Sequence, residues 1–225
     1  MTAPDIWMQT LRGSAMDLMA PTADMVDLFG DVAEVLARIC RFGGHVPGGI
    51  YPVAQHCVLG AVAIMDETGN TALARAFLLH DAHEAYLGDF TTPVAQALQR
   101  RTGLALAALL PAGVEQARRT GQGLARDALK GLKRDLDRAI FGAAGLEWPL
   151  PPEMAVEVLH WDLRMLQVER AHLLSATPHP WEPSLECIAP ARLRSRIRLW
   201  PWPDAADRYR AALKDLIPHI AARAA

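Results

Sequence analysis

Residues 77–89 read FLLHDAHEAYLGD, an apolar run that leads directly into two histidines and three carboxylates. Apolar residues recur at spacings of three and four from Ala74 onward, which predicts a buried helix that begins near Thr71 and ends before Gly88. A histidine–aspartate pair on a buried helix needs a hydrogen-bonded, ionic or metal partner. Taken alone, His80 and Asp81 fit a capping or salt-bridged surface pair equally well.

Two other predicted helices carry side chains that favour the metal interpretation. His56 lies in the first turns of an apolar helix predicted over residues 53–65, and Asp162 lies on a largely apolar helix further along the chain. Neighbouring side chains on a helix are about 100° apart, so His80 and Asp81 can lean towards one ion. Two imidazoles and two carboxylates from three helices suit a divalent transition metal with positions open to water.

The sequence resembles the HD-domain metal-dependent phosphohydrolases, in the branch of bacterial 5′-deoxynucleotidases and phage-type dATP triphosphohydrolases. The motifs follow the order of that family: RFGGH at 41–45, VAQH at 53–56, LLHDA and EAYLGD within 78–89, then Asp162 with Glu169 and Arg170. The resemblance covers roughly residues 7–175, and the run at 78–89 is its most specific part. It implies an all-α, HD-type helical bundle with a metal site between helices.

Composition agrees with a helical fold and limits the partners. The 225 residues suit a single domain over 1–225, with a last helix over 205–221, and 51% hydrophobic but 6% aromatic content favours helices over sheet. A net charge of −2 gives no electrostatic case for polymeric nucleic acid. The three cysteines match neither a disulfide framework nor a zinc finger. No apolar run approaches the roughly 20 residues of a membrane span, so we expect no membrane association and a cytoplasmic protein.

The resemblance also implies roles for individual side chains. One divalent transition metal ion per chain (Co, Mn, Zn, Fe or Ni, with Mg as a further option) would be held by His56, His80, Asp81 and Asp162. Glu84 and Asp89 would orient or deprotonate the attacking water, or protonate the leaving group. Arg41 would bind substrate phosphate, and Phe42 would pack near the sugar.

Plainer roles for these residues follow from the sequence without the resemblance. Glu84 would be an exposed helix carboxylate, and Asp89 would be the N-cap of a helix that starts near Pro93. The first long helix is expected to end at residues 41–42, where Arg41 would be a solvated charge favoured by the helix dipole.

Three functions remain open on this basis. The first is release of phosphate from a deoxynucleoside 5′-monophosphate, and the second is removal of the whole triphosphate from a deoxynucleotide such as dATP. The third is a catalytically silent module that binds nucleotides or another protein, which the retention of Glu84 and Asp89 beside all the ligand types argues against. The HDAHE order excludes the HExxH order of zincin proteases. A small-molecule nucleotide is the expected partner, and the related enzymes imply a homo-oligomer, a dimer or larger.

Two further segments have no role in this scheme. Residues near 100–122 look like an insertion that could pack on a neighbouring subunit, and Gly121 with Gly123 is expected to break its helix. Arginines at every second position from Arg192 to Arg198 alternate with apolar residues. This pattern predicts a short extended edge whose basic face is either solvated or directed at phosphate.

Overall fold

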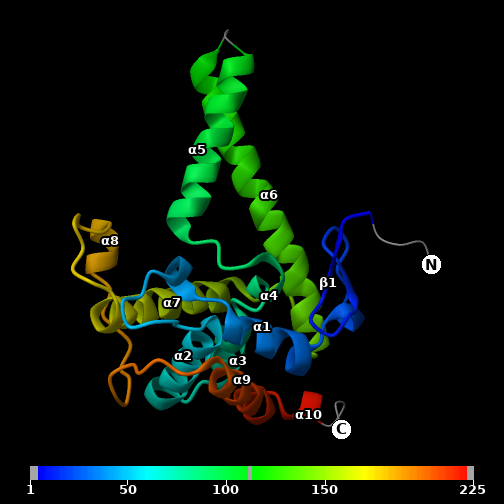
Figure 1. The fold of residues 1–225 in the computed structure, drawn as a ribbon, viewed down its shortest axis with the longest axis vertical. Coiled ribbons are helices and arrows are strands. Elements are labelled where there is room, and N and C mark those ends of the chain that lie inside the picture. The colour runs from blue at the N-terminus through cyan, green and yellow to red at the C-terminus, as the bar shows by residue number, and fades with distance from the viewer. Residues whose placement is uncertain (1–4, 111–112, 222–225) are drawn as a thin grey trace.

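Helices make up most of the chain in this computed structural model, which describes residues 5–110 and 113–221 (Figure 1). The predicted all-α fold is confirmed as a mostly helical single domain. A short antiparallel hairpin, β1 (Trp7–Gln9) with β2 (Ala15–Asp17), precedes the helices. Met16 in this hairpin is fully buried, so the hairpin is part of the packed structure.

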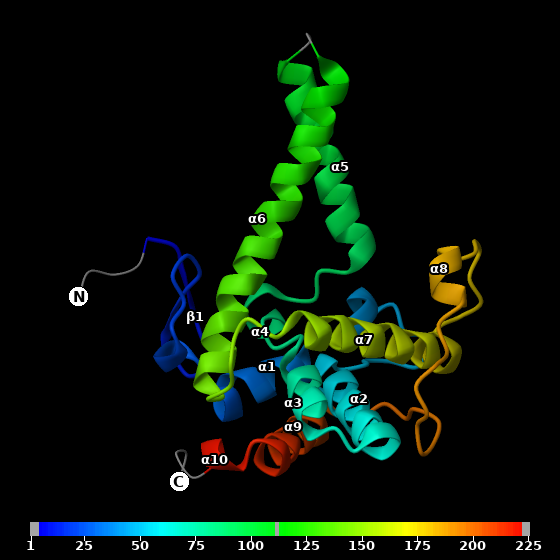
Figure 2. The ribbon, with the colours of Figure 1, turned by 180° about the vertical axis from the view of Figure 1, so that it is seen from behind.

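The body of the molecule combines helices from both halves of the sequence (Figures 1 and 2). They are α1 (Ala33–Arg38), α2 (Val53–Thr68), α3 (Thr71–Leu79), α7 (Pro152–Leu173) and α9 (Trp202–Leu216). α2 and α3 pack on each other, and α7 and α9 each contact both of them. Phe77 and Met165 are fully buried, and the Tyr209 hydroxyl donates to the Leu78 carbonyl at 2.9 Å. Each such apolar side chain contributes roughly 1.5–3 kcal/mol on burial, which holds the helices together.

The helix predicted over residues 71–87 is interrupted at the histidine–aspartate pair. α3 ends at Leu79, residues 80–83 form tight turns, and helix resumes as α4 (Glu84–Leu87). The His80 amide donates three residues back to the Phe77 carbonyl, as in a 3₁₀ turn. The prediction of a single continuous helix was therefore wrong. The tighter winding places successive side chains about 120° apart instead of 100°.

The first helical region also differs from the prediction. A π-helical turn over Leu28–Val32 leads into α1, which ends at Arg38. Arg41 therefore does not lie at a helix end but opens a 3₁₀ turn over Arg41–Gly44. Within that turn Phe42 has φ 58°, the only positive φ of a non-glycine residue in the part of the chain described. A bulky side chain holds such a conformation only where its surroundings impose it.

A long helical hairpin stands out from the body (Figures 1 and 2). Its helices are α5 (Thr92–Leu109) and α6 (Val114–Ala143). The predicted break at Gly121 and Gly123 was wrong, because α6 runs through both. A Cβ at Gly121 would lie 2.8 Å from the Gly103 Cα, so the two glycines allow the helix backbones to approach. The segment over 100–122 thus forms the outer part of this hairpin, apart from residues 111–112, which lie outside the described residues.

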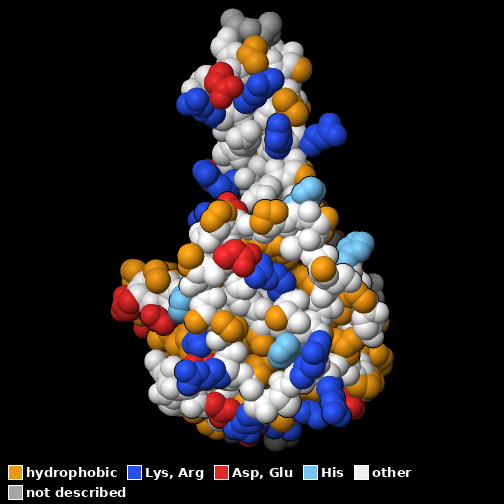
Figure 3. Space-filling model, turned by 90° about the vertical axis from the view of Figure 1, so that its left-hand side faces the viewer, with side chains coloured by type: hydrophobic (Ala, Val, Ile, Leu, Met, Phe, Trp, Pro, Cys, Tyr) orange, Lys and Arg blue, Asp and Glu red, His pale blue; other side chains and the backbone are white. Residues whose placement is uncertain are grey.

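The surface of the hairpin carries scattered apolar side chains. Those exposed include Val94, Leu98, Leu104, Leu109 and Leu124. On the face shown in Figure 3, hydrophobic side chains of the hairpin lie apart from one another among basic ones. Packing of this hairpin on a neighbouring subunit stays a prediction.

The C-terminal part crosses the body as irregular chain before the last helices. Short α8 (Pro183–Glu186) precedes it, and residues 191–199 are irregular, with a bend at 194–195, and form no β-strand. The single helix predicted over 205–221 is two helices, α9 and α10 (Pro218–Ala221), because Pro218 cannot continue the hydrogen bonding of α9. None of the described helices combines the length and apolar character that a membrane span requires.

Candidate metal centre

Three elements bring the four predicted metal ligands together. His56 comes from α2, His80 and Asp81 from the end of α3, and Asp162 from α7. The His56 and His80 Nε2 atoms lie 3.4 Å apart. Asp81 Oδ2 lies 3.7 Å from the first and 3.2 Å from the second, and Asp162 Oδ1 lies 3.3 Å and 3.8 Å from them. The structure therefore contains a His/Asp cluster between helices.

Both imidazole rings are oriented by their other nitrogen. His56 Nδ1 lies 2.6 Å from Glu169 Oε1, and His80 Nδ1 lies 2.6 Å from the Phe77 carbonyl oxygen. A carboxylate and a carbonyl can only accept, so each Nδ1 must donate. In the neutral rings the Nε2 lone pairs then point into the cluster, as in the metal-binding tautomer.

These distances fit a single divalent ion. Ligand atoms on a tetrahedral ion with bonds of about 2.1 Å lie about 3.4 Å apart. The two Nε2 atoms lie 3.2 to 3.8 Å from each other and from the Asp81 and Asp162 oxygens, close to that value. His56, His80 and Asp81 also form a group whose ligand atoms all lie within 4.8 Å of one another. The donor set, two imidazoles and carboxylates, matches the preference of divalent transition metals.

Electrostatics inside the cluster favour occupation by positive charge. Burial opposes protonation of His56 and His80, yet the neighbouring carboxylates raise the pKa of each ring to about 9. Burial likewise opposes ionisation of Asp81 and Asp162, but the imidazoles and Arg41 keep the pKa of both carboxyls below the usual range, Asp162 most strongly. Arg41 balances part of this negative charge, and protons or a metal cation can balance the rest.

Arg41 lies beside the His/Asp cluster, with its side chain 12% exposed. Its Nη1 atom is 3.0 Å from Asp81 Oδ2, and its Nη2 atom is 3.5 Å from Asp162 Oδ1. The guanidinium lies 5.7 Å from the Phe42 ring, which stacks on Tyr51. Phosphate binding by Arg41 and sugar packing by Phe42 stay predictions, with both side chains at the edge of the cluster.

Glu84 and Asp89 lie in different surroundings. Glu84 is 5% exposed, so the exposed-carboxylate alternative was wrong, and its buried Oε2 atom has no hydrogen-bond partner among the residues that the structure describes. Burial, with the charges of Asp81 and Asp89, raises the pKa of Glu84 to about 9. Burial also raises the pKa of Asp89. Asp89 does not cap α5, whose N-cap is Thr91.

The most important residue that the sequence did not assign is Glu169. It is fully buried on α7 and accepts hydrogen bonds from His56 Nδ1 and from the Tyr51 hydroxyl, the latter at 2.7 Å. Arg41 Nε lies 3.4 Å from its second oxygen. Glu169 thus orients one predicted ligand and fixes the arginine. Glu169 is seven residues from Asp162 and therefore lies on the same helix face. This spacing was the feature of the sequence that could have identified it.

His83 forms a second pair that the sequence did not indicate. Its Nδ1 atom lies 2.9 Å from Asp137 Oδ1 on α6, and its buried Nε2 atom has no hydrogen-bond partner within residues 5–110 and 113–221. Asp81, His83 and Glu84 form a further group with ligand atoms within 4.8 Å of one another. The pair connects the base of the helical hairpin to the turn that carries Asp81.

A hollow of about 220 Å³ opens beside the cluster. It is lined by His80, Asp137, Phe141, Trp148, Leu150, Ala155, Val158, Leu159 and Asp162. One end is formed by two predicted metal ligands, and most of the remaining wall is apolar. The Phe141 and Trp148 rings pack with centroids 4.8 Å apart. The hollow can hold an apolar or aromatic group attached to whatever meets the metal.

Comparison with known proteins finds relatives without a described function. The uncharacterised protein YfdR of Escherichia coli strain K12 is 32% identical over 174 residues, which cover 77% of this chain and 76% of YfdR. An uncharacterised protein of Rhodobacter capsulatus is 36% identical over 97 residues, 41% of this chain and 48% of that protein. No family model matches the chain.

Proposed function

The chain belongs to the same family as YfdR, and on that premise we propose that it is a divalent-metal-dependent phosphohydrolase acting on (deoxy)nucleotides. Release of phosphate from deoxynucleoside 5′-monophosphates is the expected reaction. The observation that carries the proposal is the convergence of two imidazole Nε2 atoms on the Asp81 and Asp162 carboxylates, with each ring held by its Nδ1 atom. The resemblance to HD-domain phosphohydrolases supplies the reaction class.

The residues would divide the work as follows. A divalent cation held by the His/Asp cluster would polarise a phosphoryl oxygen and make a nearby water more acidic. Glu84, with its raised pKa, retains a proton at neutral pH that it can give to the leaving oxygen. Asp89 would orient the attacking water and accept the proton that this water loses as its oxygen bonds to phosphorus. Arg41 would place positive charge beside the phosphate.

The hollow beside the cluster suits the organic part of such a substrate. Phosphate at the metal would lie next to His80 and Asp162, which form one end of the hollow. The nucleoside would then extend along the apolar wall towards Trp148, whose indole can stack on a base.

Nucleotide hydrolysis by the purified chain tests the proposal. The protein is incubated with Co²⁺, Mn²⁺, Zn²⁺ or Mg²⁺ and a panel of nucleoside mono- and triphosphates, and orthophosphate and triphosphate are quantified separately. We expect orthophosphate from deoxynucleoside monophosphates, whereas triphosphate release would assign the dATP-type reaction instead. His80→Gln should abolish turnover, and His160→Gln, which changes an exposed histidine on α7, should not. No metal-dependent release from any nucleotide would leave the silent module as the better explanation.

A further inference from the structure

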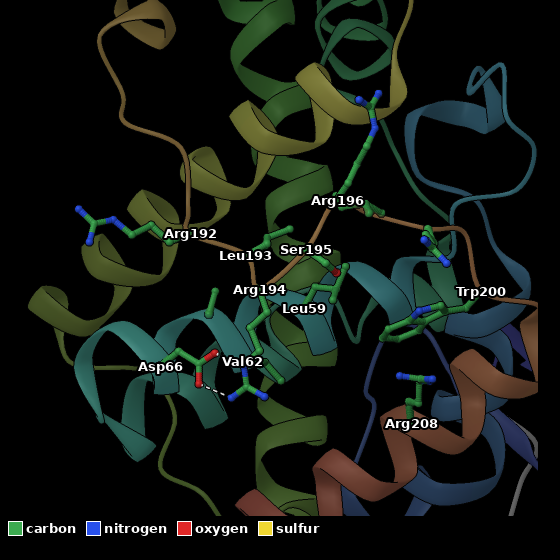
Figure 4. A pocket seen from close by; sticks show the side chains of 13 residues that line it. Leu59, Val62, Asp66, Arg192, Leu193, Arg194, Ser195, Arg196, Trp200 and Arg208 are labelled. Carbon is green, nitrogen blue, oxygen red and sulfur yellow. Dashed lines mark hydrogen bonds and ion pairs between the residues drawn. The ribbon is translucent and has the colours of Figure 1, made fainter.

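A second hollow, of about 270 Å³, lies on a neighbouring face of α2 and shares no residue with the metal centre (Figure 4). We call it the arginine groove. It is lined by Leu59, Val62, Ala63, Asp66, Arg192, Leu193, Arg194, Ser195, Arg196, Ile197, Arg198, Trp200 and Arg208. Three segments therefore form it: α2, the irregular residues 191–200, and α9.

The alternating sequence explains why the arginines line this groove. Ile197 is 8% exposed and Leu193 is half-buried, so the apolar positions of the segment face the core. The arginines at the intervening positions are consequently exposed. Buried Gln55 fixes the backbone there, because its amide donates to the Arg198 carbonyl at 2.7 Å and accepts from the Trp200 amide at 3.0 Å. The basic face is thus held by hydrogen bonds and packing.

The groove has much more positive than negative charge. Five arginines and one aspartate line it, whereas the whole chain has a net charge of −2. Asp66 is engaged by Arg194 through two contacts of 2.5 and 2.6 Å. Among the residues described, no carboxylate forms an ion pair with the remaining four groove arginines. Arg196 donates to the His172 carbonyl at 3.1 Å, so the charges of Arg192, Arg198 and Arg208 are the ones available to an external anion.

The floor of the groove is different in character. Leu59, Val62 and Ala63 give it an apolar surface, and the Arg208 guanidinium lies 4.4 Å from the Trp200 ring centre. Figure 4 shows Arg208 facing Trp200 at one end of the groove, with Arg192 and Arg196 directed outward at the rim. The groove therefore combines an apolar floor with an aromatic end and a cationic rim.

We propose that the arginine groove binds a small organic polyphosphate, such as a nucleoside triphosphate, separately from the metal centre. Guanidinium groups match phosphate oxygens in charge and in the geometry of paired hydrogen bonds. Two arginines would hold the phosphates: Arg208, whose guanidinium lies 4.4 Å from the Trp200 ring centre, and Arg198, two residues before Trp200 in the sequence. The apolar floor and the indole would receive the organic part. A hollow of this size accepts a small molecule in preference to a polymer.

Calorimetric titration of the full chain with two probes tests the proposal. Inorganic pyrophosphate presents the anion alone, and a non-hydrolysable dATP analogue presents the anion with an organic part. We expect Arg198→Ala/Arg208→Ala to raise the Kd for both probes by about tenfold or more. The matched control is Arg100→Ala/Arg101→Ala, which removes the same charge from exposed positions on α5 and should change Kd less than about twofold.

The two probes also identify the ligand. Tighter binding of the nucleotide analogue than of pyrophosphate supports an organic polyphosphate, and equal binding shows that the groove recognises the inorganic anion alone and overturns that part of the proposal. Equal Kd values for the groove variant and the control overturn the whole proposal. If the double variant does not fold by circular dichroism, Arg198→Gln replaces it, with an expected rise in Kd of about threefold or more.

A chelator separates this inference from the proposed function. Binding in the arginine groove needs no metal, so it should persist after the metal has been removed with EDTA, whereas binding at the metal centre should not. Arginine-dependent binding without any hydrolysis would contradict the proposed function only. Hydrolysis without arginine-dependent binding would contradict the groove only.

Discussion

The metal centre and the arginine groove place the same kinds of charged side chain in opposite situations. Arg41 is almost buried and has three carboxylates within 3.5 Å, those of Asp81, Asp162 and Glu169. Groove arginines such as Arg198 are exposed and have no carboxylate partner in the described structure. The difference follows from solvation, because a buried charge must be balanced within the protein, while an exposed one is stabilised by water until a ligand arrives.

Loss of the metal is the largest effect that this comparison predicts. Asp81→Ala removes a ligand from the centre of the cluster, and we expect metal content to fall from about one ion per chain to nearly none. Asp66→Ala removes the aspartate of the arginine groove and should leave the metal content unchanged. Elemental analysis of both purified variants provides the measurement. Full occupancy in Asp81→Ala would disprove the assigned ligand set.

The second largest difference between the metal centre and the arginine groove is expected in turnover. Glu84→Gln keeps the shape of the side chain but cannot give up a proton, so we expect a loss of roughly 10²–10⁴-fold in kcat with metal retained. The same change in carboxyl chemistry at the groove, Asp66→Asn, should leave kcat unchanged. Single-turnover rates and metal content are measured on both proteins. Near-normal turnover in Glu84→Gln would mean that Asp89 or the metal, and not Glu84, is responsible for the proton transfer.

Stability should differ strongly between a buried and an exposed arginine. Arg41→Ala leaves buried carboxylates without their cation, and we expect the free energy of unfolding to fall by about 3–5 kcal/mol. Arg198→Ala should change it by less than about 0.5 kcal/mol. Urea denaturation in the presence of chelator compares them. If Arg41→Ala folds, its KM for nucleotide should also rise about tenfold or more, and unchanged kinetics would limit Arg41 to a structural role.

Carboxyl groups in the two regions should respond to pH in opposite directions. The raised pKa of Glu84 means that, between its unfolded pKa near 4.5 and about 9, the folded chain holds a proton that the unfolded chain has released. Its contribution to stability therefore falls as pH rises, by up to about 1.4 kcal/mol per pH unit. Arg194 lowers the pKa of Asp66, whose contribution is lost only as pH falls below about 4. In the presence of chelator, we expect the melting temperature of Glu84→Gln to fall less between pH 6 and 8 than that of the wild type, and the raised pKa of His56 and of His80 to account for the decline that both proteins share.

The sequence predicted the helices and the ligand types better than the local geometry around them. Helical periodicity placed His56, His80 and Asp162 on separate apolar helices because buried faces recur every three to four residues. The same periodicity predicted a continuous helix over 71–87, and the rule that glycines interrupt helices predicted a break at Gly121. Both errors came from tertiary contacts: a tight turn at the metal centre, and a close crossing with Gly103 that needs a residue without a side chain.

The ion pairs of the arginines could be predicted from the sequence even less well than the local geometry. Arg41 looked like a solvated helix end because its partners Asp81 and Glu169 are 40 and 128 positions away, and no local pattern links residues so far apart. The basic alternation at 192–198 was visible, since it depends only on neighbours. The sequence did not show which of those arginines lacks a carboxylate partner, because Asp66 pairs with Arg194 across the fold.

The smallest predicted effect concerns Gln55, which lies between the two regions. Its side chain holds the groove backbone at Arg198 and Trp200, while the next residue, His56, faces the metal centre. Gln55→Leu keeps the volume but leaves the Arg198 carbonyl and the Trp200 amide unpaired, at a cost of about 1–3 kcal/mol in the free energy of unfolding. With the basic face less firmly held, Kd for pyrophosphate should rise about two- to fivefold. Metal content should not change, because Glu169 and not Gln55 orients His56. A loss of metal with unchanged pyrophosphate binding would show that Gln55 supports the metal centre instead of the groove.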